Sequence, residues 1–170
     1  MHRRWLAIFL VLLVLWVLVA QLNHYLAVWQ VYLFAGGLFV TFAALQLPLR
    51  EGLIATTLGG LLCDATTPVA PGTHVLLFAA AHAVIFNLRD RVPRDQTITR
   101  VIIALLTNLG LFLIFSFGQI GHSPSPGAIW PRLIFDLGCS QVFIALVAPW
   151  CFALQMRALE LAGEENRRLY

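Results

Sequence analysis

The stretch that decides the fold runs from Pro48 to His74 and reads PLREGLIATTLGGLLCDATTPVAPGTH. It contains an apolar segment of membrane-spanning length, with one acid, Asp64, inside it and a Pro/Gly-rich turn directly after. An ionised carboxylate in hydrocarbon costs at least a few kcal/mol, so such a residue normally faces a bundle interior or a partner. The rest of the chain must therefore explain how this acid is tolerated.

The composition predicts an all-α integral membrane protein with a single transmembrane domain, 1–170. Of the 170 residues, 60% are hydrophobic and 11% are charged, and the mean hydropathy is +0.84. Soluble domains carry about 25% charged residues, and no polar stretch here is long enough to fold alone. Cys63, Cys139 and Cys151 all fall in apolar segments without metal or redox spacing, so we expect them to be packing residues.

Six apolar segments come near the roughly 20 residues that a spanning helix needs. They predict a six-transmembrane-helix bundle with helices at 5–22, 26–47, 52–69, 73–88, 101–120 and 133–156. The first begins MHRRW, as a signal peptide does, but it lacks the small residue two positions before Ala20, so we expect it to be retained. Most links are short, which makes neighbouring helices antiparallel.

The arginines predict the orientation, because cytoplasmic loops carry an excess of basic residues. All eleven basic residues are arginine. With both termini cytoplasmic, only Arg132 lies outside, and the inner side holds Arg3, Arg4, Arg50, Arg89, Arg91, Arg94, Arg100, Arg157, Arg167 and Arg168. The inner link 89–100 is strongly charged and could contact anionic headgroups or an acidic partner, or could simply reflect this topology.

The third predicted helix has one small and polar face. Gly52, Thr56, Gly60 and Asp64 recur every four residues, while its leucines fall largely elsewhere. Small residues at this spacing let membrane helices approach closely. This helix should therefore be a central packing helix, either within the bundle or, alternatively, against a partner protein.

Asp64 follows Gly52 by twelve residues, about 18 Å along a helix, which places it in the outer half of the bilayer. Three interpretations follow. It could be a structural acid bonded to hydroxyls or backbone, for instance in the hairpin at 66–68. It could be ion-paired with the last helix, or it could bind a ligand or protons.

The cation available for an ion pair is Arg132, which opens the sixth predicted helix four residues before Asp136. Both lie at the outer level, as does Gln30. We hypothesise an outer cluster of Asp64, Arg132 and Asp136, with Gln30 nearby, that ties the third and sixth helices together. The alternative is that Arg132 pairs with Asp136 alone and extends to water.

Motifs for catalysis or metal binding are missing from the sequence. There is no GxSxG, HExxH, Walker loop or paired-acid motif, and His82 has no second ligand at metal-binding spacing. We expect His82 to be a hydrogen-bonded core residue and Asn108 to bond between helices. We therefore expect no catalytic residue, cofactor, metal or nucleic-acid partner.

The opening stretch resembles the MreD family of rod-shape-determining membrane proteins. The resemblance rests on Pro48-Leu49-Arg50, on Gly60 four residues before Asp64, and on Gly72 eight residues after it. The chain also fits that family in length, in six predicted helices, in a basic N-terminus and in a polar tail.

The resemblance implies a fold similar to the S-components of ECF vitamin transporters. It implies a non-enzymatic scaffold of the cell-elongation complex in the bacterial inner membrane, binding MreC directly and acting with MreB, a SEDS glycan polymerase and a class B penicillin-binding protein. The structural or partner-binding candidates are then Pro48, Arg50, Gly60, Asp64, Gly72, Arg132 and Asp136.

Two other functions compete with this scaffold. In a substrate-binding subunit of a vitamin-type transporter, the outer cluster would be a ligand pocket. In a membrane enzyme acting on a lipid-linked substrate, Asp64 or Asp136 would be an acid or base. Given the resemblance, we interpret Asp64 as structural, holding the outer hairpin in shape.

Overall fold

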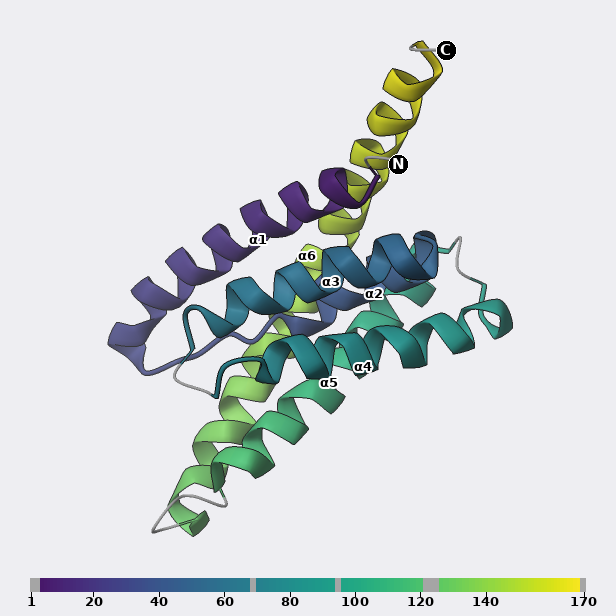
Figure 1. Cartoon of the computed structure of the whole chain (residues 1–170). Coiled ribbons are helices and arrows are strands. Elements are labelled where there is room, and N and C mark those ends of the chain that lie inside the picture. The colour runs from purple at the N-terminus through teal and green to yellow at the C-terminus, as the bar shows by residue number, and fades with distance from the viewer. Residues whose placement is uncertain (1–3, 68–69, 94–95, 121–125, 169–170) are drawn as a thin grey trace.

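The computed structural model describes residues 4–67, 70–93, 96–120 and 126–168. Within these residues the chain is helical apart from its links and has no β-strand. Six α-helices of eleven residues or more are described there, namely α1 (Arg4–Leu26), α2 (Gly36–Gln46), α3 (Leu49–Asp64), α4 (Thr73–Leu88), α5 (Thr97–Ile120) and α6 (Pro126–Arg168) (Figure 1). Short 3-10 helices follow α1 and α4, as η1 (Ala27–Trp29) and η2 (Arg89–Arg91).

Successive helices run in opposite directions between two ends of the bundle. The start of α1, the end of α2, the start of α3, the end of α4 and the end of α6 lie toward the right or upper right of Figure 1, and the ends of α1, α3 and α5 lie toward the left or lower left. Arg132 belongs to the lower-left end, near the start of α6, whereas Arg50, Arg89 and Arg91 lie at the other end, called here the arginine-rich end. The assignment of that end to the cytoplasm stays a prediction.

Three helical stretches are long and apolar enough to cross a bilayer by themselves, namely Arg4–Trp29, Thr97–Gly118 and Ile129–Ala162. These stretches indicate a protein that is embedded in a membrane. α3 and α4 have 16 residues each and α2 has 11. At 1.5 Å per residue, 16 residues reach only about 24 Å, so helix length alone supports fewer spans than the six predicted.

The second predicted helix, 26–47, is wrong over its first half. Leu26 ends α1, and Gln30 takes left-handed backbone angles with φ 56° after η1. Residues 31–35, called here the extended segment, form no helix before α2 begins at Gly36. Non-helical backbone is tolerated at membrane depth only where protein covers it, and Leu33, Phe34 and Ala35 are indeed buried.

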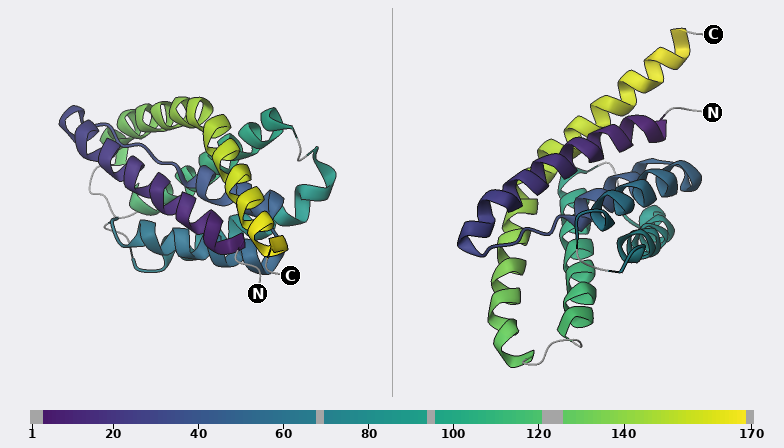
Figure 2. Two further views of the ribbon diagram at one scale, coloured as in Figure 1. Left: turned by 90° about the horizontal axis from the view of Figure 1, so that it is seen from above. Right: turned by 60° about the vertical axis from the view of Figure 1, so that its left-hand side comes forward.

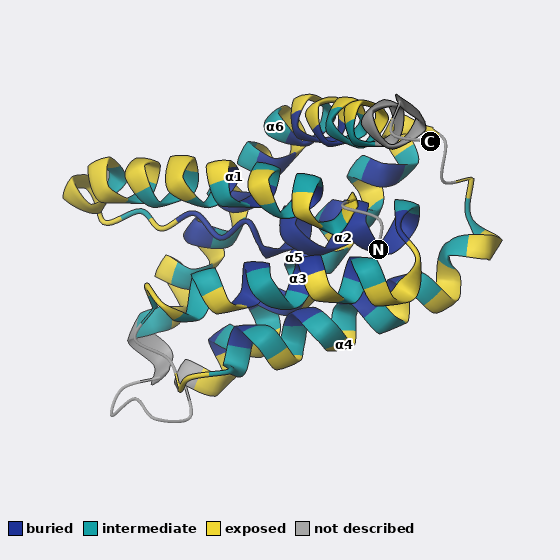
Figure 3. Ribbon diagram, turned by 45° about the horizontal axis from the view of Figure 1, so that its top comes forward, coloured by how far each residue is buried: buried dark blue, intermediate teal, exposed yellow. Residues whose placement is uncertain are grey.

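α2 is the centre of the molecule. It is buried from Gly36 to Leu45, and in Figure 3 it forms a dark blue core among the other helices. α3, α4, α5 and α6 all pack against it. Because every side of α2 meets protein, it needs no polar face, and its sequence GGLFVTFAALQ is apolar all round.

Gly37 lets α2 and α5 approach closely. A Cβ added there would lie 2.2 Å from the carbonyl oxygen of Ala104 and 2.9 Å from the Cβ of Asn108. The Gly36-Gly37 pair thus marks the break in the second predicted segment, because glycine both interrupts regular helix and permits backbone contact.

The other boundaries differ by fewer residues. α4 (Thr73–Leu88) begins and ends where predicted. α3 ends at Asp64, before the predicted end at position 69, and position 69 itself lies outside the described residues. α6 is longer than predicted at both ends and continues into the polar tail. It contains Pro149, which removes one helical hydrogen bond, and Figure 2 shows α6 bending along this part of its length.

We predict that Gly37→Ala destabilises the fold by about 1–3 kcal/mol, the usual cost of overpacking a rigid site. The obstructing atom belongs to the backbone of α5, so it cannot rotate away. Thermal unfolding in detergent measures the effect.

The matched control is Gly110→Ala on α5, where an added Cβ meets no atom within 4 Å. This change should be neutral or stabilise by up to about 1 kcal/mol, because alanine favours helix over glycine. Equal stability changes in the two variants would contradict the close contact of α2 and α5.

Candidate functional site

Asp64 ends α3 and holds the first turn of α4. Its Oδ2 accepts hydrogen bonds from the backbone N–H of Gly72 at 3.0 Å and of Val75 at 3.4 Å. Its Oδ1 accepts from the backbone N–H of His74 at 3.0 Å and lies 2.7 Å from the Nδ1 of that residue. The Asp64 side chain is 7% exposed, and that of His74 is 4% exposed.

These contacts make Asp64 the N-terminal cap of α4, supplied from another helix. The first N–H groups of a helix have no partner within it, and a side-chain oxygen normally satisfies one of them. The carboxylate also faces the positive end of the helix dipole. Asp64 is therefore bonded to backbone, as the first of the three interpretations predicted. The backbone groups that it caps belong to residues 72–75 and not to the predicted hairpin at 66–68.

His74 connects this cap to α5. Because Nδ1 faces a carboxylate, it is assigned as the donor to Asp64. The imidazole stacks on Phe115 of α5, with ring centroids 4.4 Å apart, and meets the edge of Phe78 at 5.8 Å. The Asp64–His74 pair thus joins the end of α3, the start of α4 and the C-terminal part of α5.

The two glycines of the motif complete the same joint. A Cβ on Gly60 would lie 2.8 Å from the Cα of Val75 and 2.9 Å from its nitrogen, so only glycine lets α4 begin this close to α3. Gly72 has φ 88°, a left-handed conformation that favours glycine. The spacing Gly60, Asp64, Gly72 therefore has one physical explanation, which is the close and capped start of α4.

Pro48 and Arg50 lie at the opposite, arginine-rich end of α3. Pro48 is the residue before α3, with φ −58° and ψ 149°, and its carbonyl accepts the first helical hydrogen bond from Gly52. Both Pro48 and Arg50 are exposed. They start the helix and face outward, so they take no part in the Asp64 cap.

The predicted cluster of Asp64, Arg132 and Asp136 is not formed. Among the residues that the structure describes, Asp64 makes its ion pair with His74, and the nearest acid to the Nε of Arg132 is Asp136 at 4.0 Å. Arg132 is 61% exposed, which agrees with the alternative of a local pair. Gln30 is exposed after η1 and does not join either acid.

Asp136 instead supports the extended segment together with Ser140. The Oδ1 of Asp136 accepts from the backbone N–H of Tyr32 at 3.1 Å. The hydroxyl of Ser140 accepts from the N–H of Phe34 at 2.9 Å and donates to the carbonyl of Asp136 at 2.7 Å. Two side chains of α6 thus satisfy alternate N–H groups of one extended strand of backbone.

Amide side chains complete the support from the other sides. Asn23 of α1 pairs with Leu33, accepting from its N–H at 2.8 Å and donating to its carbonyl at 2.9 Å. Asn108 of α5 accepts from the N–H of Gly37 at 3.1 Å, so it does bond between helices as predicted. The sequence placed Ser140 on one face with Asp136 but did not identify Asn23 or His74, each of which lies among other polar residues of its helix.

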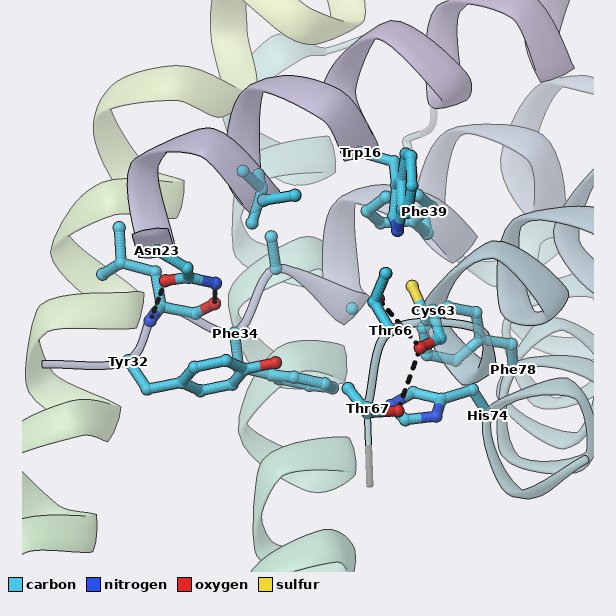
Figure 4. Close-up of a pocket in the computed structure, with 15 residues that line it drawn as sticks. Trp16, Asn23, Tyr32, Phe34, Phe39, Cys63, Thr66, Thr67, His74 and Phe78 are labelled. Carbon is cyan, nitrogen blue, oxygen red and sulfur yellow. Dashed lines mark hydrogen bonds between the residues drawn. The ribbon is translucent and has the colours of Figure 1, made fainter. Parts of the chain in front are cut away.

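A small pocket lies between these two polar sites, lined by α1, the extended segment and the α3–α4 joint (Figure 4). Asn23, Tyr32, Thr67 and His74 are among its lining residues. Its volume is about 60 Å³, which corresponds to about two water molecules. This pocket is too small for an organic substrate, because ligand pockets measure about 300–1,000 Å³.

Other candidate residues are enclosed in the core. His82 is fully buried, with its Nδ1 3.0 Å from the hydroxyl of Thr56 and its ring stacked on Phe86. Within the described ranges, no group of three or more His, Cys, Asp or Glu side chains could hold a metal ion. Comparison with protein-family models, with curated proteins and with solved structures gave no match.

We predict that Asp64→Asn destabilises the protein by about 1–3 kcal/mol, because an amide presents one oxygen, and an unwanted N–H, to four donors. A double-mutant cycle with His74→Phe should show coupling of about 0.5–3 kcal/mol, as expected of residues in contact. Chemical or thermal unfolding in detergent measures each variant.

The control cycle pairs Asp64→Asn with Arg132→Gln. Because the two side chains do not meet, their effects should add to within about 0.5 kcal/mol. Strong coupling in this second cycle, with none in the first, would restore the predicted outer cluster.

We predict a similar loss for Asn23→Leu, about 1–3 kcal/mol, since it leaves the N–H and C=O of Leu33 without partners. Asn87→Leu, an exposed asparagine on α4, is the matched control and should change stability by less than about 0.5 kcal/mol. Hydrogen exchange at the extended segment provides a second measurement, because it should accelerate in Asn23→Leu alone.

Proposed function

We propose that this protein is a non-enzymatic scaffold subunit of the bacterial cell-elongation complex, of the MreD type, and that it lies in the inner membrane. The observation that supports this most directly is the use of Gly60, Asp64 and Gly72 in one structural joint. These three of the residues that carry the family resemblance hold the start of α4 against α3. The carboxylate at their centre is fully engaged, so no acid is left there for chemistry on a substrate.

The proposal includes six membrane crossings with both termini in the cytoplasm. The alternating direction of α1 to α6 supports this count. The second crossing combines the extended segment with α2: five extended residues reach about 16 Å and eleven helical residues another 16 Å or so. Together they match the hydrocarbon thickness of about 30 Å. A relation in fold to ECF S-components belongs to the same proposal.

The direct partner in this proposal is MreC, a single-span protein with a periplasmic coiled coil. Arg132 lies at the outer end of α6 and is 61% exposed, so it can meet a partner on the periplasmic side. Arg50 is exposed at the cytoplasmic end. MreB, the SEDS polymerase and the class B penicillin-binding protein would then be linked indirectly, and peptidoglycan synthesis positioned through this assembly.

The geometry counts against the transporter alternative. A vitamin-type substrate would need an outer pocket several times larger than the 60 Å³ available. The acids that were to line such a pocket are turned toward backbone N–H groups instead. A scaffold requires a rigid frame and no outer ligand pocket, and these contacts support such a frame.

We predict that the tagged protein, solubilised in mild detergent, co-purifies with MreC of the same host. Arg132→Gln should lower the recovered MreC several-fold while leaving the unfolding temperature unchanged, because an exposed ion pair contributes less than about 1 kcal/mol. Arg157→Gln, an exposed arginine at the other end, is the matched control and should retain MreC.

Depletion in a rod-shaped host should widen or round the cells. Unchanged cell width, or a protein that purifies with a bound small molecule and ignores MreC, would contradict the scaffold.

A further inference from the structure

A large apolar groove separates α4 from α5. Both helices pack on α2 and touch each other little, leaving a groove of about 740 Å³ between them. Its lining is almost entirely aliphatic and includes Leu77 and Val84 of α4 and Ile102, Leu106 and Ile114 of α5, with Leu45 of α2 among the residues that line it. Several of these side chains are strongly exposed, among them Val84 at 58% and Leu106 at 62%.

One end of the groove carries a fixed cation. Arg89, which follows α4, lines the groove at the arginine-rich end. Its Nη1 donates to the carbonyl of Leu47 at 3.0 Å, and its guanidinium lies 3.7 Å over the ring of Phe86. The Asp90 carboxylate is 3.8 Å from its Nε, an ion pair beyond hydrogen-bond distance, and that Nε has no hydrogen-bond partner.

The contacts of Arg89 hold its guanidinium at the groove, and its one recorded ion pair is long and solvent-exposed. A carbonyl and an aromatic ring orient the guanidinium, while the nearest acid is 75% exposed and engages it weakly. The side chain of Arg89 keeps 21% of its surface exposed. Arg91, two residues on, is also exposed. The groove therefore joins a long apolar wall to a positive rim.

We propose that this groove binds one anionic phospholipid, with an acyl chain along α4 and α5 and the phosphate at Arg89. Basic sites between transmembrane helices on the cytoplasmic side are suited to acidic headgroups. Along α5 the groove extends from Thr99 to Ile114, a length of about 22 Å. One leaflet is roughly 15 Å deep, so the groove is long enough to hold a whole acyl chain. A partner helix would fill the apolar wall equally well, and the test below distinguishes it from lipid.

Gly110 allows the groove to be closed without disturbing the fold. It lines the groove, and an added Cβ there meets no atom within 4 Å. Gly110→Leu should therefore fill the groove while favouring the helix. Gly138→Leu on α6 is the matched control, because Gly138 also has open space around it and lies outside the groove.

The test is native mass spectrometry of the full-length protein in detergent, titrated with phosphatidylglycerol or with phosphatidylethanolamine of the same acyl chains. We expect phosphatidylglycerol to bind at least several-fold more tightly. Arg89→Gln should weaken it about tenfold, the factor that one charge-assisted hydrogen bond provides. Gly110→Leu should abolish the bound lipid, and Gly138→Leu should retain it.

Three results would overturn the proposal. The first is equal binding of the two lipids, and the second is lipid binding that survives Gly110→Leu. The third is a single-span protein, in place of lipid, that is retained by the wild type and lost in Gly110→Leu. The measurement uses no MreC, so its outcome is independent of the scaffold proposal.

Discussion

The structure depends on one constraint, which is that backbone N–H groups buried at membrane depth must find an acceptor within the protein. Each unsatisfied group costs several kcal/mol where no water can reach it. Two places in this fold create such groups, the close start of α4 and the extended segment before α2. Asp64 satisfies the first, and Asp136 and Ser140, with Asn23, satisfy the second. The most polar residues of the apolar helices are thus explained by irregular backbone.

This constraint also explains how two acids are tolerated in an apolar bundle. A carboxylate that accepts several N–H bonds is compensated much as it would be by water, and a helix N-terminus adds a favourable dipole. Asp64 has three backbone donors and an imidazole. Asp136 has one backbone donor and a distant arginine, and it is correspondingly closer to the exposed start of α6. Neither acid needs the other, which is why no ion pair ties α3 to α6.

Much of the helical order follows from hydropathy, and the exceptions have physical reasons. α4 was predicted to the residue because Gly72 precedes it and the charged link follows it. The second segment was not, because a buried extended strand and a buried helix are equally apolar, and only Gly36-Gly37 distinguishes them. The Asp64–Arg132 pair failed for another reason. Hydropathy places residues at a depth in the membrane but does not fix their angular position around the bundle. Likewise, the bond from Tyr32 to Asp136 joins residues 104 positions apart, which no periodicity reveals.

The break in the second segment also shapes the outer surface of the molecule. Because α2 is short and central, α3, α4, α5 and α6 all pack on it, and α3 also packs on α4 and α5 on α6, whereas α4 and α5 touch each other little. α4 is drawn toward α3 by the Asp64 cap and by Gly60, and α5 is drawn toward α2 by Gly37 and Asn108. α4 and α5 meet where His74 stacks on Phe115, and the groove lies between the remaining parts of the two helices. The fold therefore leaves an apolar surface that the surrounding membrane must fill.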